Sequence, residues 1–129
     1  MADFFVLHVD DDANIRALTE LSFALSGGGE VRSAASGAEA MALLAAGLRP
    51  DLILLDVMMP DMDGPAVLAR VRQLPDHRDT PIIFMTAQTQ DHERAALMAL
   101  GAAGVVIKPF DPMTLCQQVR SLIDVHTGD

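Results

Sequence analysis

The sequence predicts an α/β domain in which a five-stranded, doubly wound parallel sheet carries five helices on its two faces. Short apolar runs and longer amphipathic segments alternate five times along the 129 residues. Three of the apolar runs are almost uninterrupted, as expected of parallel strands that are buried on both faces. Such alternation favours strands joined by crossover helices. The length is typical of one domain with its own core.

The predicted strands are short, and one of them differs from the rest. The second run, EVRSA, alternates between polar and apolar residues, so we expect it at an edge of the sheet. His8 lies inside the first run and is interpreted as a packed core residue. The five runs are Phe4–Val9, Glu30–Ala34, Leu52–Leu55, Ile82–Met85 and Val105–Ile107.

The first two helices have clear start signals. Asp12 or Asn14 can cap the first helix, and the glycines at 27–29 end it. Ser36, followed three residues later by Glu39, forms a capping box for the second helix. The buried side of the first helix is predicted from helical spacing to carry Ile15, Leu18, Leu21, Ser22 and Leu25.

The last three helices are marked by proline, glycine and aspartate. Pro65 suits the first turn of the third helix. The fourth helix is predicted over 92–100, and Gly101 closes it. Asp111 and Pro112 form an N-cap and first-turn pair for the fifth helix.

Composition excludes several classes of function. The formal net charge is −9, from 18 acidic and 9 basic residues, which argues against direct binding of nucleic acid or of an anionic membrane. Cys116 is the single cysteine and fits a reducing compartment. The N-terminus has no basic flank before its acidic run, and no apolar stretch approaches about 18 residues. We therefore expect a cytoplasmic domain without a membrane span.

Polar residues follow four of the predicted strands. Because the carboxyl ends of parallel strands meet at one edge of a sheet, these side chains are expected to converge there. The lysine in this set is the only lysine in the chain. The set comprises Asp10, Asp11 and Asp12 after the first strand, Asp56 after the third, Thr86 after the fourth, and Lys108 with Pro109 after the fifth.

These residue types favour a metal-assisted phosphoryl site. Crowded carboxylates repel one another unless a divalent cation neutralises them, and an all-oxygen ligand set favours Mg²⁺, with Mn²⁺ as a substitute. Lys and Thr side chains are suitable donors to phosphoryl oxygens. A carboxylate can itself be the nucleophile, and Asp56 is the best placed. Taken singly, an Asp at a strand end is more often a cap, which is our interpretation of Asp12.

From Phe4 to Ile123 the chain resembles a response-regulator receiver domain. The segments that carry the resemblance are VDDD at 9–12, LLDVMMPDMDG at 54–64, PIIFMTA at 81–87 and GAAGVVIKPFDP at 101–112. The order and spacing of these segments, taken together, make the resemblance specific. The resemblance implies the flavodoxin-like strand order 2-1-3-4-5. We assign residues 1–125 to the receiver domain and residues 126–129 to a short C-terminal tail.

The resemblance implies a metal ligand set. Asp10 and Asp11 would be the acidic pair that holds Mg²⁺, with Asp11 as the direct ligand. Asp56 would accept the phosphoryl group and also ligate the metal. The backbone carbonyl of Met58 would complete the protein ligands.

The resemblance also implies roles around the phosphoryl group. Thr86 and Lys108 would contact its oxygens, and the Lys108–Pro109 peptide bond would be cis. Val105 stands at a switch position where the family often has an aromatic residue. Since the chain contains no Tyr, we expect phosphorylation to shift the fourth helix and its preceding loop instead of a ring.

The activity implied is signalling and not catalysis on a separate substrate. A histidine kinase or a histidine phosphotransfer protein would supply the phosphoryl group from a phosphohistidine. Water would later remove it, and the phosphorylated form would change its contacts with a downstream protein target. The chain would thus assist its own phosphorylation and dephosphorylation.

Three other functions fit less well. A phosphatase of the haloacid dehalogenase type needs a DxDx[TV] nucleophile motif after the first strand, where this chain has DDDAN. A flavodoxin-like FMN carrier needs a Ser/Thr-rich phosphate loop there, and an acidic cluster would repel the phosphate. A pseudo-receiver that works without phosphorylation would have lost Asp56 or Lys108, and both are present.

Overall fold

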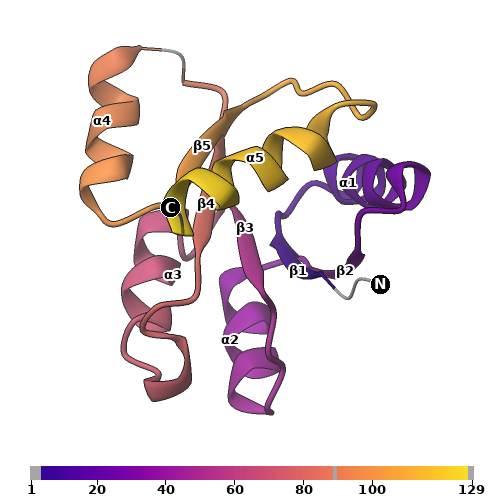
Figure 1. Ribbon diagram of the computed structural model, residues 1–129. Helices are drawn as coiled ribbons and strands as arrows, with labels where there is room; N and C mark the ends of the chain where they lie inside the picture. The colour runs from indigo at the N-terminus through magenta and orange to yellow at the C-terminus, as the bar shows by residue number, and fades with distance from the viewer. Residues whose placement is uncertain (1–3, 89, 128–129) are drawn as a thin grey trace.

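The computed structural model describes residues 4–88 and 90–127, over which five strands alternate with five α-helices (Figure 1). Strands β1 to β5 span, in order, Phe5–Val9, Glu30–Ala34, Leu52–Asp56, Ile82–Thr86 and Gly104–Ile107. Helices α1 to α5 span Ala13–Ser26, Gly37–Ala45, Gly64–Val71, Asp91–Ala99 and Leu115–Thr127. A short 3-10 helix, η1, covers Pro75–His77 before β4.

The strands form one parallel sheet in the order β2-β1-β3-β4-β5, which confirms the predicted fold and strand order. The alternating strand β2 lies at an edge, as its pattern predicts. The chain reverses its direction of winding at β1 and β3, and polar sites in open parallel sheets form at the carboxyl ends of such a pair.

Helices cover both faces of the sheet, and each face has its own core. Helices α2, α3 and α4 pack on one face around β3 and β4 residues such as Leu55 and Phe84. Helices α1 and α5 pack on the other face, where Phe23 and Val119 meet Leu54. The central strands are buried on both sides, which explains why their sequences are uninterrupted apolar runs.

The predicted cap residues occupy the helix ends. The Asp12 carboxylate accepts hydrogen bonds from the amides of Asn14 and Ile15 at 2.8 and 3.4 Å. Gly27 ends α1 with a left-handed φ of 66°, a conformation that glycine adopts without strain. The Ser36 hydroxyl caps α2 by accepting from the amide of Glu39 at 3.0 Å.

The predicted buried face of α1 is wrong in part. Leu18, Leu21 and Leu25 are exposed, and the buried residues of the helix are Thr19, Ser22 and Phe23. The exposed leucines and the buried residues both recur at helical spacing, so the period alone does not decide which of the two stripes faces the sheet. The large Phe23 fills the core above the sheet, which leaves the neighbouring leucine stripe facing outward.

The start of α5 also differs from the prediction. Asp111 does bond the amide of Met113 at 2.9 Å, but this contact caps a turn, and the helix begins at Leu115. The helix continues to Thr127 and so includes His126, the first residue of the predicted tail. The remainder of the predicted tail, 128–129, lies outside the described residues. In the part of the chain that the structure describes, no helix is long and apolar enough to cross a membrane.

Candidate functional site

The register of the central strands brings two aspartates side by side. Val9 of β1 pairs with Leu55 of β3. The next residue in each case is an aspartate: Asp10 directly follows β1, and Asp56 is the last residue of β3. Both residues are buried, and both stand at the carboxyl edge of the sheet.

Strands β4 and β5 bring two further polar residues to the same edge. Thr86 pairs with Ile107, and the backbone amide of Lys108 donates to the Thr86 carbonyl at 2.8 Å. The Lys108–Pro109 peptide bond is cis. The four strand ends that the sequence predicts to converge are therefore adjacent in the sheet.

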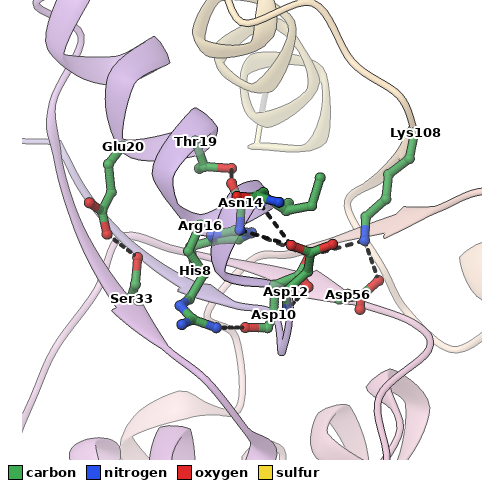
Figure 2. A network of polar contacts seen from close by, with 11 residues as sticks. His8, Asp10, Asp12, Asn14, Arg16, Thr19, Glu20, Ser33, Asp56 and Lys108 are labelled. Carbon is green, nitrogen blue, oxygen red and sulfur yellow. Dashed lines mark hydrogen bonds and ion pairs between the residues drawn. The ribbon is translucent and has the colours of Figure 1, made fainter.

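Lys108 joins the two buried aspartates. Its Nζ donates to Oδ2 of Asp10 at 3.0 Å and to Oδ1 of Asp56 at 2.9 Å, and Figure 2 shows the side chain reaching across from β5. The carboxylates are 0% and 5% exposed, and the lysine side chain is 17% exposed. Water screens such a cluster poorly, so its charges interact strongly.

The protonation of this cluster reflects burial and pairing. Burial raises the pKa of Asp56 above its ordinary value, and the hydrogen bonds from Lys108 and from the backbone of Met58 oppose this increase. The charge of Asp10 raises the pKa of Asp56 further. For Lys108, burial favours the neutral form, but the two carboxylates outweigh it and the pKa of Lys108 is raised. The lysine therefore remains a cation.

A third carboxylate completes an all-oxygen cluster. Carboxylate oxygens of Asp10, Asp11 and Asp56 lie within 4.8 Å of one another, and Asp11 is exposed to solvent. This donor set contains no sulfur or nitrogen, and it fits a hard divalent cation that retains several waters. The exposed Asp11 provides an open side through which such a cation can enter.

The loop after β3 folds back over the site. The amide of Gly64 donates to the Val57 carbonyl at 2.9 Å, and a Cβ at position 64 would lie 2.7 Å from the backbone oxygen of Asp56. Glycine is therefore required for this close approach. The loop leaves the side chain of Met58 exposed while its backbone hydrogen-bonds the Asp56 carboxylate.

Thr86 is buried and its hydroxyl accepts a hydrogen bond from the amide of Gln88 at 3.0 Å. The amide nitrogen of the Gln88 side chain can in turn donate to both carboxylate oxygens of Glu93, at 2.9 and 3.1 Å. Glu93 lies in the first turn of α4. Thr86 is thus linked through two contacts to a helix on the surface.

Val105, at the predicted switch position, is half-buried in β5 and packs against the core on the α4 side of the sheet. Its partner in the strand register is Phe84 of β4. A valine at this position has no ring that could turn between inward and outward orientations, so any movement near Thr86 must pass to other groups.

Two residues at the site were not predicted. Arg16 of α1 donates through Nη1 to the backbone carbonyl of Asp10 at 2.9 Å (Figure 2). The ring of His8 lies near the same residue, with Nε2 4.0 Å from Oδ2 of Asp10. Alternate residues of a strand share a face, so the position of His8 beside Asp10 could have been inferred from their spacing. Nothing in the sequence indicates the contact of Arg16.

Comparisons with known proteins indicate the family of this chain. Residues 6–120 match the response regulator receiver domain family. The chain is 36% identical over 118 residues to the probable transcriptional regulator ycf27 of Porphyridium aerugineum, which covers 92% of this chain and 47% of that protein. It therefore spans about half the length of this relative.

Two other relatives match along most of their length. An uncharacterized 14.6 kDa protein of Leptolyngbya boryana is 38% identical over 121 residues, which cover 93% of this chain and 90% of that protein. The solved structure of the chemotaxis response regulator CheY4 of Vibrio cholerae superposes with a TM-score of 0.85 at 36% identity, covering 94% of this chain and 99% of that one. On this match of sequence and fold, the chain belongs to the response regulator receiver domain family.

Proposed function

We propose that this receiver domain accepts a phosphoryl group on Asp56 in a Mg²⁺-dependent reaction and later loses it to water. The observation that carries the proposal is the shared contact of Lys108 with Asp10 and Asp56. An ammonium group held between two buried carboxylates at the edge of the sheet is well placed to pair with phosphoryl oxygens once one of those carboxylates is phosphorylated.

Asp56 has the properties of the nucleophile. One carboxylate oxygen attacks phosphorus as the bond from phosphorus to the donor nitrogen breaks, and an aspartyl phosphate results. Lys108 favours the ionised form that this attack requires and holds the oxygen in place. Hydrolysis then transfers the phosphoryl group from Asp56 to water and restores the free carboxylate.

Asp10, Asp11 and Asp56 would hold the Mg²⁺, with the Met58 backbone carbonyl as a further ligand. When bound, the cation supplies positive charge that offsets the charge of the phosphoryl oxygens. Mn²⁺ would serve in its place. Asp11 contributes an exposed carboxylate, while Asp10 contributes a buried one whose orientation its neighbours fix.

Thr86 and Lys108 would bind oxygens of the phosphoryl group. The Thr86 hydroxyl, which accepts from Gln88 in this structure, has its own proton to donate to a phosphoryl oxygen. The Lys108 ammonium has three donors and can contact a second oxygen while it still bonds one aspartate. These contacts would accelerate phosphoryl transfer to Asp56 by positioning the phosphoryl group and by stabilising its negative charge.

The partners we propose are proteins. A histidine kinase or histidine phosphotransfer protein donates the phosphoryl group, and a downstream protein recognises the changed surface. The net charge of −9 does not favour nucleic acid as a direct ligand of this chain. We also propose a cytoplasmic location and no activity on a separate substrate.

Incubation with a small-molecule phosphodonor and Mg²⁺, followed by intact-mass measurement, tests the proposal. We expect the mass to increase by one phosphoryl group and the increase to disappear in Asp56→Ala or in EDTA. Asp51→Ala is the matched control: Asp51 is an exposed aspartate one residue before β3 begins, and its variant should still be labelled. An unchanged mass of the wild type, under conditions that label an established receiver, would contradict the proposal.

A further inference from the structure

The imidazole of His8 is buried without a hydrogen-bond partner. The residue is fully buried in β1, and among the described residues neither Nδ1 nor Nε2 has a partner. An unsatisfied polar ring in a core lowers stability relative to an apolar side chain of similar size. Val6, two residues earlier on the same face of β1, is an apolar core residue. Packing alone therefore does not explain a histidine at this position.

The ring is close to the acidic cluster. Its Nε2 lies 4.0 Å from Oδ2 of Asp10, the same oxygen that accepts from Lys108 at 3.0 Å. The polar side chains on the buried face of α1 do not satisfy the ring. The Thr19 hydroxyl donates to the backbone carbonyl of Ile15, and Ser22 has no partner of its own in the described structure.

The surroundings of the imidazole favour its neutral form. Burial, together with the positive charges of Lys108 and Arg16, lowers the pKa of His8 to about 3. A neutral imidazole carries one N–H, so the ring can donate from Nε2 only in the Nε2–H tautomer. In that tautomer the ring can offer one hydrogen bond to Asp10 without adding a charge to the cluster.

We propose that His8 is a positioning residue for Asp10, and that its Nε2–H replaces Lys108 as the donor to Oδ2 when Lys108 turns toward a phosphoryl group on Asp56. The inference rests on the proposed function. In this structure Lys108 is the donor to that oxygen, at 3.0 Å, and the 4.0 Å from His8 Nε2 is too long for a hydrogen bond. Once the ammonium turns away, a shift of about 1 Å brings Nε2 within range.

The replacement would fix the orientation of a metal ligand. Asp10 is completely buried, so no bulk water can take the place of Lys108. Without a donor to Oδ2, the carboxylate would be held only through Oδ1, which accepts from the amide of Asp12 at 2.9 Å. When a residue that hydrogen-bonds a metal ligand, but does not touch the metal, is mutated, the metal affinity commonly falls about tenfold or more.

Nitrogen-detected NMR of histidine-labelled protein tests the inference directly. The signals of His8 are assigned by their loss in His8→Gln, and spectra are compared for the free protein, with Mg²⁺, and with Mg²⁺ and beryllofluoride. We expect the Nε2–H tautomer throughout. With beryllofluoride, the Nε2 proton should move downfield and exchange more slowly. An Nδ1–H tautomer, or a His8 ring whose signals do not change with beryllofluoride, would overturn the inference.

Two variants separate positioning from packing. His8→Leu should raise the midpoint of thermal unfolding, because it removes the unsatisfied ring, and should weaken Mg²⁺ affinity, measured by calorimetry in the presence of beryllofluoride, about tenfold. His8→Gln retains a donor and should recover most of that affinity. His92→Gln, at an exposed residue of α4, is the control and should change neither property. If His8→Leu lowers stability and leaves Mg²⁺ affinity unchanged, His8 is a packing residue only.

The outcome can be separated from that of the proposed function. A wild-type protein that gains no phosphoryl mass contradicts the assignment of Asp56. A wild-type protein that is phosphorylated normally while the His8 signals stay fixed contradicts only the role of His8.

Discussion

The ammonium of Lys108 lies 2.9 Å from the carboxylate of Asp56, although 52 residues separate them in the chain. The parallel register produces this contact, because each residue directly follows the last apolar position of its strand. The pairing stabilises a buried charge and also places the cation where a phosphoryl group would be attached. One contact thus connects the stability of the fold with the chemistry of the site.

Lys108→Met should both destabilise the metal-free protein and impair phosphorylation. Removing the lysine leaves two buried carboxylates without a counter-charge, which should lower the free energy of unfolding by about 3 kcal/mol. The loss of a donor to the phosphoryl oxygens should slow labelling by a small phosphodonor about 100-fold. Denaturant unfolding and the time course of intact mass measure the two effects.

The control for this variant is Arg49→Met, which breaks the exposed ion pair of Arg49 with Asp76. Both side chains of that pair are more than 60% exposed, so its loss should cost less than about 1 kcal/mol. Equal destabilisation by the two variants would show that the buried pairing has no special energetic role.

Asp11→Asn should weaken binding of Mg²⁺ roughly tenfold, because the affinity of an oxygen site depends on its ligand charge. The matched variant is Asp12→Asn. Asp12 is also exposed, but it caps α1, and asparagine is an equally good cap. Titration calorimetry should therefore distinguish the two neighbours. A similar loss of affinity in both variants would mean that overall charge controls binding and that Asp11 is not a ligand.

The sheet and the polar residues at its edge could be predicted because local pattern and topology agree. A buried parallel strand must be apolar throughout, so the first polar residue after it marks the strand end. Asp56 and Lys108 were found in this way, and parallel pairing then required them to share an edge. The structure adds the distances and the shared contact, which depend on side-chain conformation.

The errors have different physical causes. Leu18 and Thr19 belong to two stripes of α1 that both fit the helical period, and packing against the sheet selected the less apolar one. Asp111 followed by Pro112 is typical of the start of a helix, but the chain forms a turn there before α5 begins. The contact of Arg16 with the Asp10 carbonyl depends on how α1 crosses the sheet, which no local pattern specifies.

Activation should move the loop before α4 and the first turn of that helix. The Thr86 hydroxyl accepts from the amide of Gln88, whose side chain can donate to Glu93, so a shift of the hydroxyl toward a phosphoryl group would disturb both contacts. Amide NMR spectra with and without beryllofluoride should therefore show large changes through Glu93. Asp56→Ala should show none. Changes confined to the immediate surroundings of Asp56 would contradict this route.

The stability of the metal-free protein should depend on pH through Asp56. Its pKa is raised above 3.8 by burial, so the folded state takes up a proton at a higher pH than the unfolded chain does. Ionised Asp56 therefore costs stability above its folded pKa, and this cost disappears as the pH falls toward 3.8. Asp56→Asn, which resembles the protonated form, should unfold at a higher temperature than the wild type at pH 7.

Thermal unfolding followed by circular dichroism in EDTA measures this difference across pH. The advantage of Asp56→Asn should shrink steadily on acidification, because the wild type becomes protonated at the same position. Adding Mg²⁺ at pH 7 should reverse the order, since a cation that binds the folded wild type raises its free energy of unfolding by an amount that grows with the ratio of the cation concentration to Kd. A variant that is less stable than the wild type at every pH would show that the contact with Lys108 outweighs the cost of burying the Asp56 charge.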